Sequence, residues 1–173
     1  MGFAGPERVT DARTLEAIYR LRAAVWRETG DIAQAAFGDG RWSDEHDPAS
    51  THWAVRDGDE LVAAARLSVH ERLADVPEAE EYAAAGLRLE GRIAAPARVV
   101  VAASARRHGL AGQLLDAQDE AGRAAGCTFA VRQSSPAMSR LLARRGWRDA
   151  GPAGRDERFP GVRFEVMVLE LSP

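Results

Sequence analysis

The chain has 173 residues, of which 46% are hydrophobic and 28% charged, which is enough for one globular core and short for two. No apolar run approaches the roughly 20 residues that span a bilayer, and the first residues lack a basic segment followed by an apolar one. We therefore expect a cytoplasmic protein that does not act in a membrane. The net charge of −3 argues against non-specific binding to nucleic acids.

The cysteine and lysine content excludes several kinds of chemistry. A single cysteine, Cys127, rules out a disulfide framework within the chain and any cysteine-rich zinc site. The chain contains no lysine, which excludes Schiff-base chemistry and the GxxxxGK[ST] phosphate loop. Arginine and backbone groups must therefore hold any bound anion, and a small molecule is the expected partner.

The first predicted element is an amphipathic helix over residues 11–29. Thr10 or Asp11 is placed to cap its start, and Gly30 follows where a C-terminal cap belongs. Arg22 falls in the middle of the apolar face that should pack into the core. A guanidinium at that position needs an anionic partner nearby.

The next segments predict a long loop and a hairpin. Residues 30–50 show no steady periodicity and gather Gly, Asp and aromatic residues, which is typical of loops that carry sites. Two apolar runs, 52–55 and 61–67, flank the turn sequence at 57–60 and predict two antiparallel strands. Residues 72–92 predict a weak helix and a loop.

The second half alternates strands and helices. Strands are expected at 98–102, 127–131 and 162–171, and helices follow the first two of them. The first of these helices ends at Gly126, and the second begins after Ser135, an N-cap residue followed by proline. The residues before the last strand are interpreted as a Gly/Pro-rich connector.

The segment from Arg98 to Leu115 is the most informative. Its glycine-bearing turn opens a helix, so unpaired backbone N–H groups and the positive end of the helix dipole converge there, as in a diphosphate site. Gly109 and Gly112 permit close approach, and Arg106 and Arg107 add two guanidinium groups. The alternative is an ordinary strand-to-helix connection with solvated arginines.

The run Arg106-Arg107-His108-Gly109-Leu110-Ala111 matches the motif [RQ]xxGx[GA] and resembles the coenzyme A pyrophosphate loop of the GNAT acyltransferases. Residues 98–148 are also similar to that family in the order of their elements. The resemblance implies an α/β (α+β) fold, with a central mixed, mostly antiparallel twisted sheet flanked by helices and residues 1–173 as a single domain. It implies acetyl-CoA or another acyl-CoA as donor, an amine or amino-acid-like acceptor and no metal, with a homodimer left open.

The resemblance also assigns cofactor-binding residues. Val99 and Val101 would offer backbone groups to the pantetheine arm and the acyl carbonyl. Ser135 aligns with an asparagine that often contacts this arm in the family, although an N-cap role already explains it. The turn residues would cradle the diphosphate, namely Arg106, Arg107, His108, Gly109, Leu110, Ala111 and Gly112.

The amino-terminal half is similar, more loosely, to the acyl-homoserine-lactone synthase branch of this fold, which takes acyl groups from a carrier protein. The likeness rests on residues 21–26, the cluster Asp44-Glu45-His46-Asp47, His52 and residues 65–67. It departs at Ala95-Pro96-Ala97, where an acidic residue is expected. The substrate-binding candidates are Arg22, Trp26, Trp42 and Arg66.

Arg22 and Arg66 inside a fold require carboxylates, and Asp44 and Asp47 are the nearest candidates. We therefore predict that both arginines are at least partly buried and paired. A purely architectural ion-pair network remains an alternative to a substrate role.

In the family's direct transfer, a deprotonated amine attacks the thioester, and many members place a tyrosine near the leaving thiolate. Leu142 aligns with that tyrosine, so Tyr82 or Ser134 would have to replace it, or no acid is needed. The catalytic candidates are Asp44, Asp47 and Tyr82, with further possible bases at Glu45, His46, His70 and Glu71. A catalytically silent acyl-CoA-binding domain is the third alternative.

Overall fold

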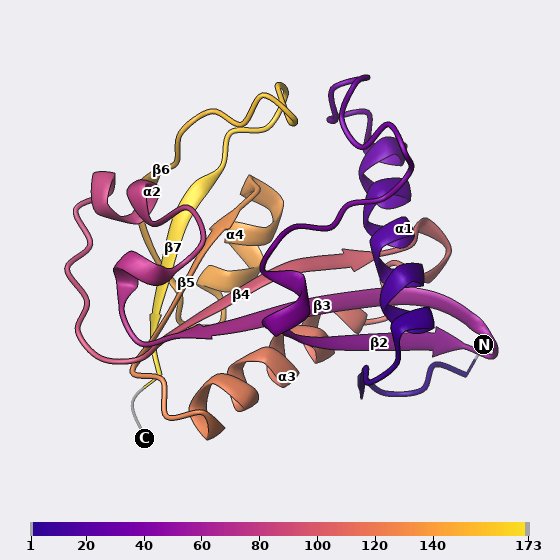
Figure 1. Cartoon of the computed structure of the whole chain (residues 1–173), viewed down its shortest axis with the longest axis horizontal. Coiled ribbons are helices and arrows are strands. Elements are labelled where there is room, and N and C mark those ends of the chain that lie inside the picture. The colour runs from indigo at the N-terminus through magenta and orange to yellow at the C-terminus, as the bar shows by residue number, and fades with distance from the viewer. Residues whose placement is uncertain (1, 172–173) are drawn as a thin grey trace.

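The computed structural model describes residues 2–171, which form a seven-stranded sheet in the order β1-β2-β3-β4-β5-β7-β6 (Figure 1). The strands are β1 (Glu7–Arg8), β2 (Thr51–Asp57), β3 (Glu60–His70), β4 (Ile93–Val101), β5 (Phe129–Ser134), β6 (Arg148–Pro152) and β7 (Glu165–Glu170). Among the described pairs, β4 and β5 are parallel and the others antiparallel. The predicted mixed, mostly antiparallel sheet is thus confirmed.

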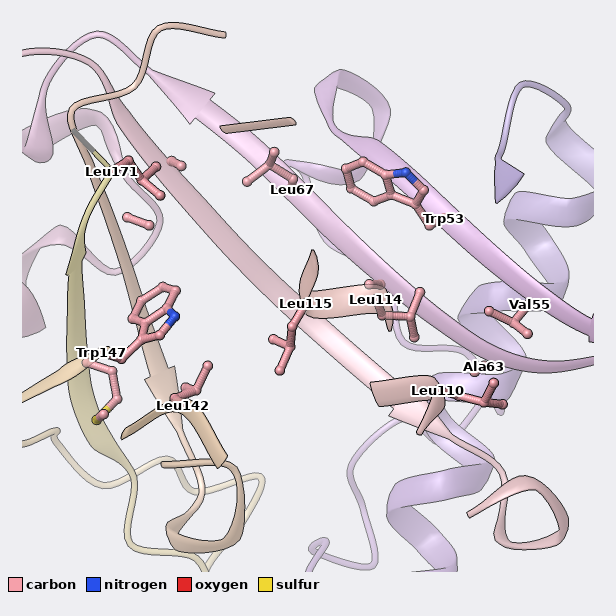
Figure 2. Close-up of a cluster of buried hydrophobic side chains, with 14 of the residues drawn as sticks. Trp53, Val55, Ala63, Leu67, Leu110, Leu114, Leu115, Leu142, Trp147 and Leu171 are labelled. Atoms are coloured by element: carbon pink, nitrogen blue, oxygen red, sulfur yellow. The ribbon is translucent and has the colours of Figure 1, made fainter. Parts of the chain in front are cut away.

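Helices cover both faces of this sheet. They are α1 (Ala12–Thr29), α2 (Ala79–Ala84), α3 (Leu110–Ala124) and α4 (Pro136–Ala143), with short 3-10 turns at 47–49, 73–75 and 103–105. Figure 2 shows the hydrophobic core cluster on the α3 face, which includes Leu114 and Leu115 of α3 and strand residues such as Leu67. On the opposite face, Ile18 of α1 packs with Ala64 and Val100. No helix within residues 2–171 is both long and apolar enough to cross a membrane.

The ends of the first helix follow the sequence prediction. Asp11 caps α1 by accepting a hydrogen bond from the Thr14 amide at 2.7 Å, and Gly30 adopts a left-handed conformation at its C-terminus. Ser135 likewise caps α4 through the amide of Met138. Cys127 is buried in the core as a free cysteine.

Several strand predictions were wrong or incomplete. The strand expected at 98–102 begins at Ile93, because pairing with β3 overrides the low strand propensity of the Ala/Pro run. The segment interpreted as a connector contains β6, and β1 was not predicted. Both are edge strands whose sequences lack apolar alternation, so their pairing with a neighbouring strand defines them.

The parallel strands β4 and β5 separate soon after they meet. Their register includes only Ile93 with Phe129 and Ala94 with Ala130, although both strands continue further. Figure 1 shows the two strands diverging from this common end. Arg98 has a positive φ of 58°, within an irregularity of the β3–β4 register. We call the opening between β4 and β5 the splay.

Candidate functional site

A cavity of about 520 Å³ opens at the splay. Residues from α1 and the loop after it, β3, β4, α2, β5 and the segment before β7 line it. Five residues predicted from sequence to bind the substrate or to act in catalysis line this cavity, namely Trp26, Trp42, Asp44, Arg66 and Tyr82. Val99 and Ser135 from the predicted donor side also line it.

Beside the cavity lies a buried cluster of alternating charges. Asp47 Oδ1 accepts hydrogen bonds from Nη1 of Arg22 at 2.9 Å and from Nη1 of Arg66 at 3.1 Å. Asp44 joins Arg66 through Oδ1 at 2.6 Å and Arg98 through Oδ2 at 2.8 Å. Arg22 and Arg66 are 0% and 2% exposed, so the prediction that both are buried and paired is confirmed. We call these five residues the charge cluster.

Sequence reasoning missed Arg98 as a member of this cluster. The guanidinium carbon of Arg98 lies 4.0 Å from the ring centroid of Trp42. Arg98 has a positive φ and lies at the irregularity in the β3–β4 register. Local sequence gives no signal for that irregularity. Arg22 is fully buried and bonds to Asp47, the Trp42 carbonyl and His52. It therefore holds Asp47 in place, and it is not among the residues that line the cavity.

The two cluster carboxylates are weak bases. Burial opposes ionisation of Asp44, but the hydrogen bond from Arg98 and the charge of Arg66 hold its pKa well below the usual range. Burial acts in the same way on Asp47, and the charges of Arg22 and Arg66 keep its pKa low as well. Both groups are ionised and engaged at neutral pH, which argues against the general-base role expected for them.

A second polar group lies at the β3 side of the cavity. The hydroxyl of Ser68, which lines the cavity, is 2.9 Å from Nε2 of His70. Ser68 pairs in register with Ala95. Ala95 belongs to the Ala95-Pro96-Ala97 segment, in which the resemblance to the synthases leads us to expect an acidic residue that this chain does not have. Burial, followed by the charge of His46, lowers the pKa of His70, so its imidazole is neutral at pH 7 and able to accept a proton. His46 also lines the cavity.

The other predicted acid–base groups occupy different environments. Tyr82 is 4% exposed and lines the cavity, and burial raises the pKa of its phenol, which stays protonated. Glu71 is bonded to Arg92 and does not line the cavity. Leu142, aligned with the family tyrosine, is fully buried in the hydrophobic core near Trp147 (Figure 2).

The turn from Arg106 to Gly112, which we call the glycine turn, leads into α3. Gly109 occupies the N-cap position with a φ of 77°, and no side chain caps the helix there. The first amides of a helix lack partners within it, so they point toward the space before α3. A Cβ added at Gly109 or Gly112 would meet nothing within 4 Å, so a ligand has room to approach the backbone.

Side chains of the glycine turn take different positions. Arg106 and Arg107 are exposed, and Arg106 lies 3.8 Å from Glu28. The ring of His108 lies 5.0 Å from that of Phe3. Leu110 is 2% exposed and packs in the core, so only its backbone is available to a ligand, and Ala111 is half-buried. The turn therefore offers amides and guanidinium groups at one place, which suits an anionic ligand.

Donor-side groups on β4 and at the start of α4 complete the site. Val99 and Val101 lie on the part of β4 that has separated from β5, so their backbone groups have no partner strand on that side. The Ser135 hydroxyl caps α4 and is used within the protein. In residues 2–171 we find no group of three or more His, Cys, Asp or Glu side chains that could hold a metal ion.

Comparisons with known proteins agree with this arrangement. The sequence model of the GNAT acetyltransferase family matches residues 15–147. No curated protein sequence matches significantly. Among solved structures, a candidate N-acetyltransferase from Lactobacillus plantarum is 21% identical, with a TM-score of 0.68 over 99% of this chain and all of the other.

Two further structures show the breadth of the fold. Escherichia coli ElaA is 20% identical, with a TM-score of 0.63 over 95% of this chain and 99% of its own. The structure of BjaI, a CoA-dependent acyl-homoserine lactone synthase, with SAM and isopentyl-CoA is 17% identical, with a TM-score of 0.74 over 98% of this chain and 84% of its own. At these identities the likeness establishes the fold.

The chain has the sheet, the splay and the glycine-bearing turn of an acyltransferase. It belongs to the GNAT acetyltransferase family, as the match over residues 15–147 shows. GNAT acyltransferases generally use acyl-CoA as the donor and act on small amines.

Proposed function

We propose that this protein transfers an acetyl or other short acyl group from acyl-CoA to an amine by direct attack in a ternary complex in the cytoplasm. The observation that carries the proposal is the splay, at which a cavity of about 520 Å³ opens, while the glycine turn follows the end of β4. A donor held at the turn can extend between β4 and β5. Its thioester then reaches a cavity large enough for a second small molecule.

The donor's diphosphate would bind the uncapped amides of the glycine turn, with Arg106 and Arg107 adding charge. The open space at Gly109 and Gly112 fits this role. The backbone of Val99 and Val101 would bind the pantetheine arm and the acyl carbonyl. An N–H at that position would also stabilise the oxyanion that forms when the carbonyl is attacked.

Ser68 and His70 are proposed to accept the proton of the amine. In the tautomer in which Nε2 of His70 accepts from the Ser68 hydroxyl, the Ser68 oxygen faces the acceptor and relays the proton to the imidazole. The amine nitrogen forms a bond to the carbonyl carbon, the bond from that carbon to sulfur breaks, and the sulfur leaves with the electron pair. The charge cluster holds Asp44 and Arg66 at the cavity wall.

The leaving sulfur need not be protonated as it departs, because a thiol pKa of about 8.5 makes the thiolate a modest leaving group near neutral pH. Tyr82, which lines the cavity and remains protonated, is proposed to donate a hydrogen bond to the leaving sulfur. We expect kcat/KM to show little decline below about pH 9, since such a decline reports an essential acid.

A synthase-type reaction with a longer acyl group is the second candidate. The charge cluster and the order of its residues along the chain favour it, as does the TM-score of 0.74 with BjaI. A carrier-protein donor would require docking of a second protein. Comparing acetyl-CoA, octanoyl-CoA and octanoyl carrier protein as donors separates the two candidates.

The decisive test measures thiol release from acetyl-CoA with a panel of primary amines and amino acids, alongside calorimetric titration of acetyl-CoA alone. We expect binding, and amine-dependent release that falls by roughly a hundredfold in His70→Gln. Ser68→Ala should lower it while leaving donor affinity unchanged. Tight donor binding without release for any amine would favour the silent acyl-CoA-binding domain instead.

A further inference from the structure

Arg132 is a buried arginine inside the splay. It lies on β5, two residues beyond Ala130, which is the last β5 residue that pairs with β4. It is 6% exposed and lines the cavity. Side chains two positions apart on a strand share a face of the sheet, and Ala130 packs in the core beneath α3. Arg132 therefore faces the side of the sheet that carries α3 and the glycine turn.

The guanidinium of Arg132 lacks the partners that the other buried arginines have. Its Nε donates to the Ser134 hydroxyl at 3.1 Å, and its Nη1 is buried without a hydrogen-bond partner. No carboxylate within residues 2–171 forms an ion pair with it, whereas Arg22 and Arg66 share Asp47. Burial lowers the pKa of Arg132 to about 10, which still leaves it charged at neutral pH.

Neighbouring ionisable groups act on Arg132 only over a distance. Tyr82 is protonated and uncharged at neutral pH, and Asp119, whose charge favours the protonated form of Arg132, lies 3.8 Å from Arg145 and forms its ion pair there. A buried cation without a partner is strongly unfavourable. A guanidinium left unpaired at a cavity wall is therefore suited to an anion that the ligand brings.

We propose that Arg132 binds a carboxylate carried by one of the two substrates, an inference that rests on the proposed acyl transfer. A carboxylate matches the planar guanidinium with two parallel hydrogen bonds. Because Arg132 faces the side of α3 and the glycine turn, the favoured source is an acyl group that ends in a carboxylate, such as succinyl. The acceptor's own carboxylate is the other source of the same chemistry.

The test uses four substrate pairs and three variants. Acetyl-CoA and succinyl-CoA are each combined with phenethylamine and with phenylalanine, which differ by one carboxylate. Arg132→Met removes the charge, Arg132→Lys keeps it without the planar fork, and Arg148→Met is the matched control at an exposed arginine that does not line the cavity.

We expect the wild type to prefer a carboxylate-bearing substrate by roughly tenfold or more in kcat/KM, the ratio expected from a hydrogen bond to a charged group. Arg132→Met should erase that preference, Arg132→Lys should retain part of it, and Arg148→Met should leave it intact. A preference in the donor pair assigns the carboxylate to the acyl group, and one in the acceptor pair assigns it to the amine. A wild type without either preference, or a preference that survives Arg132→Met in a folded variant, would overturn the proposal.

Binding measured without turnover separates the inference from the proposed function. Calorimetry compares succinyl-CoA with acetyl-CoA, and phenylalanine with phenethylamine, in wild type and Arg132→Met, and circular dichroism verifies the fold. If no pair turns over but the tighter binding of the carboxylate ligand disappears in Arg132→Met, the inference stands and the enzymatic proposal fails. If turnover occurs with no dependence of preference on Arg132, the inference alone fails. Arg132→Lys serves the same purpose should Arg132→Met not fold.

Discussion

The charge cluster and the glycine turn both gather arginines, yet they are built in opposite ways. In the cluster, Arg22, Arg66 and Arg98 are each matched by Asp44 or Asp47. At the turn, Arg106 and Arg107 are exposed, and the amides before α3 have no capping side chain. Every arginine of the cluster has a close carboxylate partner, whereas at the turn Arg106 lies 3.8 Å from Glu28 and Arg107 forms no ion pair with any residue between 2 and 171.

This difference indicates that the charge cluster stabilises the fold, whereas the glycine turn is available to bind a ligand. Removing a charge from the cluster leaves another charge buried, so the main effect falls on stability. Adding negative charge at the turn opposes a ligand without disturbing a packed core, so the main effect falls on binding. The predictions below, from the largest expected effect to the smallest, test whether the two regions respond separately.

Asp47→Ala should destabilise the protein by roughly 3 to 5 kcal/mol, because it leaves Arg22 buried without its carboxylate and deprives Arg66 of one of its two. The free energy of unfolding, measured by urea denaturation, checks this. The matched control is Asp75→Ala, which removes a surface pair with Arg72 and should remain close to wild type. Equal stability of Asp47→Ala and wild type would mean that the cluster is not a structural support.

Gly109→Asp should weaken acetyl-CoA binding by roughly a hundredfold or more, since like charges brought together at a binding site cost several kcal/mol. The side chain enters open space, so the change in unfolding free energy should be limited to the backbone cost of a non-glycine residue at a φ of 77°, which urea denaturation measures. Calorimetric titration measures the affinity.

The control for this change is Gly109→Asn, which has the same size and the same left-handed backbone requirement at a φ of 77° but no charge. It should bind acetyl-CoA much more tightly than Gly109→Asp. If the folded Asp variant bound as well as wild type, the donor's diphosphate would have to lie elsewhere.

The turn and four of the five cluster residues could be predicted from sequence, but Arg98 and the way in which the cluster closes could not. Glycines and arginines of the turn are adjacent in the chain, and their chemistry depends on local backbone geometry at a helix start. The cluster joins α1, a loop, β3 and β4, and its closure depends on Arg98 at the irregularity of β4. The pairing of Arg22 and Arg66 was predictable because a buried guanidinium requires an anion, but the identity of each pair was not.

The same reasoning applies to the fold and the rest of the cavity. Helices α1 and α3 carry apolar stripes and glycine caps, so their sequences define them. The strand β6 and the start of β4 have no such pattern and form through pairing with neighbours. The lack of a carboxylate partner for Arg132 could not be predicted from sequence, because it depends on which side chains of residues 2–171 the fold brings to the splay.

Protonation of Asp47 at low pH should lower the free energy of unfolding, because the charge cluster then loses one of its carboxylates. The pKa of Asp47 is lower in the folded protein than the value of about 3.9 in an unfolded chain, so its stabilising effect is present above about pH 4 and is lost as the pH falls through the folded pKa. Asp47→Asn removes this titration. Plots of unfolding free energy against pH should therefore be less steep for Asp47→Asn than for wild type below about pH 4, and parallel plots would contradict the assignment.

Salt should weaken ligand binding at the glycine turn and have little influence on the ion pairs of the charge cluster. This is the smallest effect that we expect. Raising the ionic strength from about 0.1 M to about 1 M shortens the screening length from roughly 10 Å to about 3 Å. Exposed Arg106 and Arg107 then attract a diphosphate less strongly, whereas the buried pairs of Arg22 and Arg66 are screened much less.

We therefore expect acetyl-CoA affinity to fall a few-fold with salt, and Arg107→Gln to lower it by roughly fivefold at low salt, the size of a single exposed charge contact. The salt dependence of binding should also be smaller in Arg107→Gln, because one of the screened charges is gone. Arg13→Gln, an exposed arginine at the start of α1, is the control and should match wild type in both respects. An affinity that is insensitive to salt and to Arg107→Gln would show that the backbone amides alone bind the donor. The arginines of the turn would then be solvated side chains that do not contribute to binding.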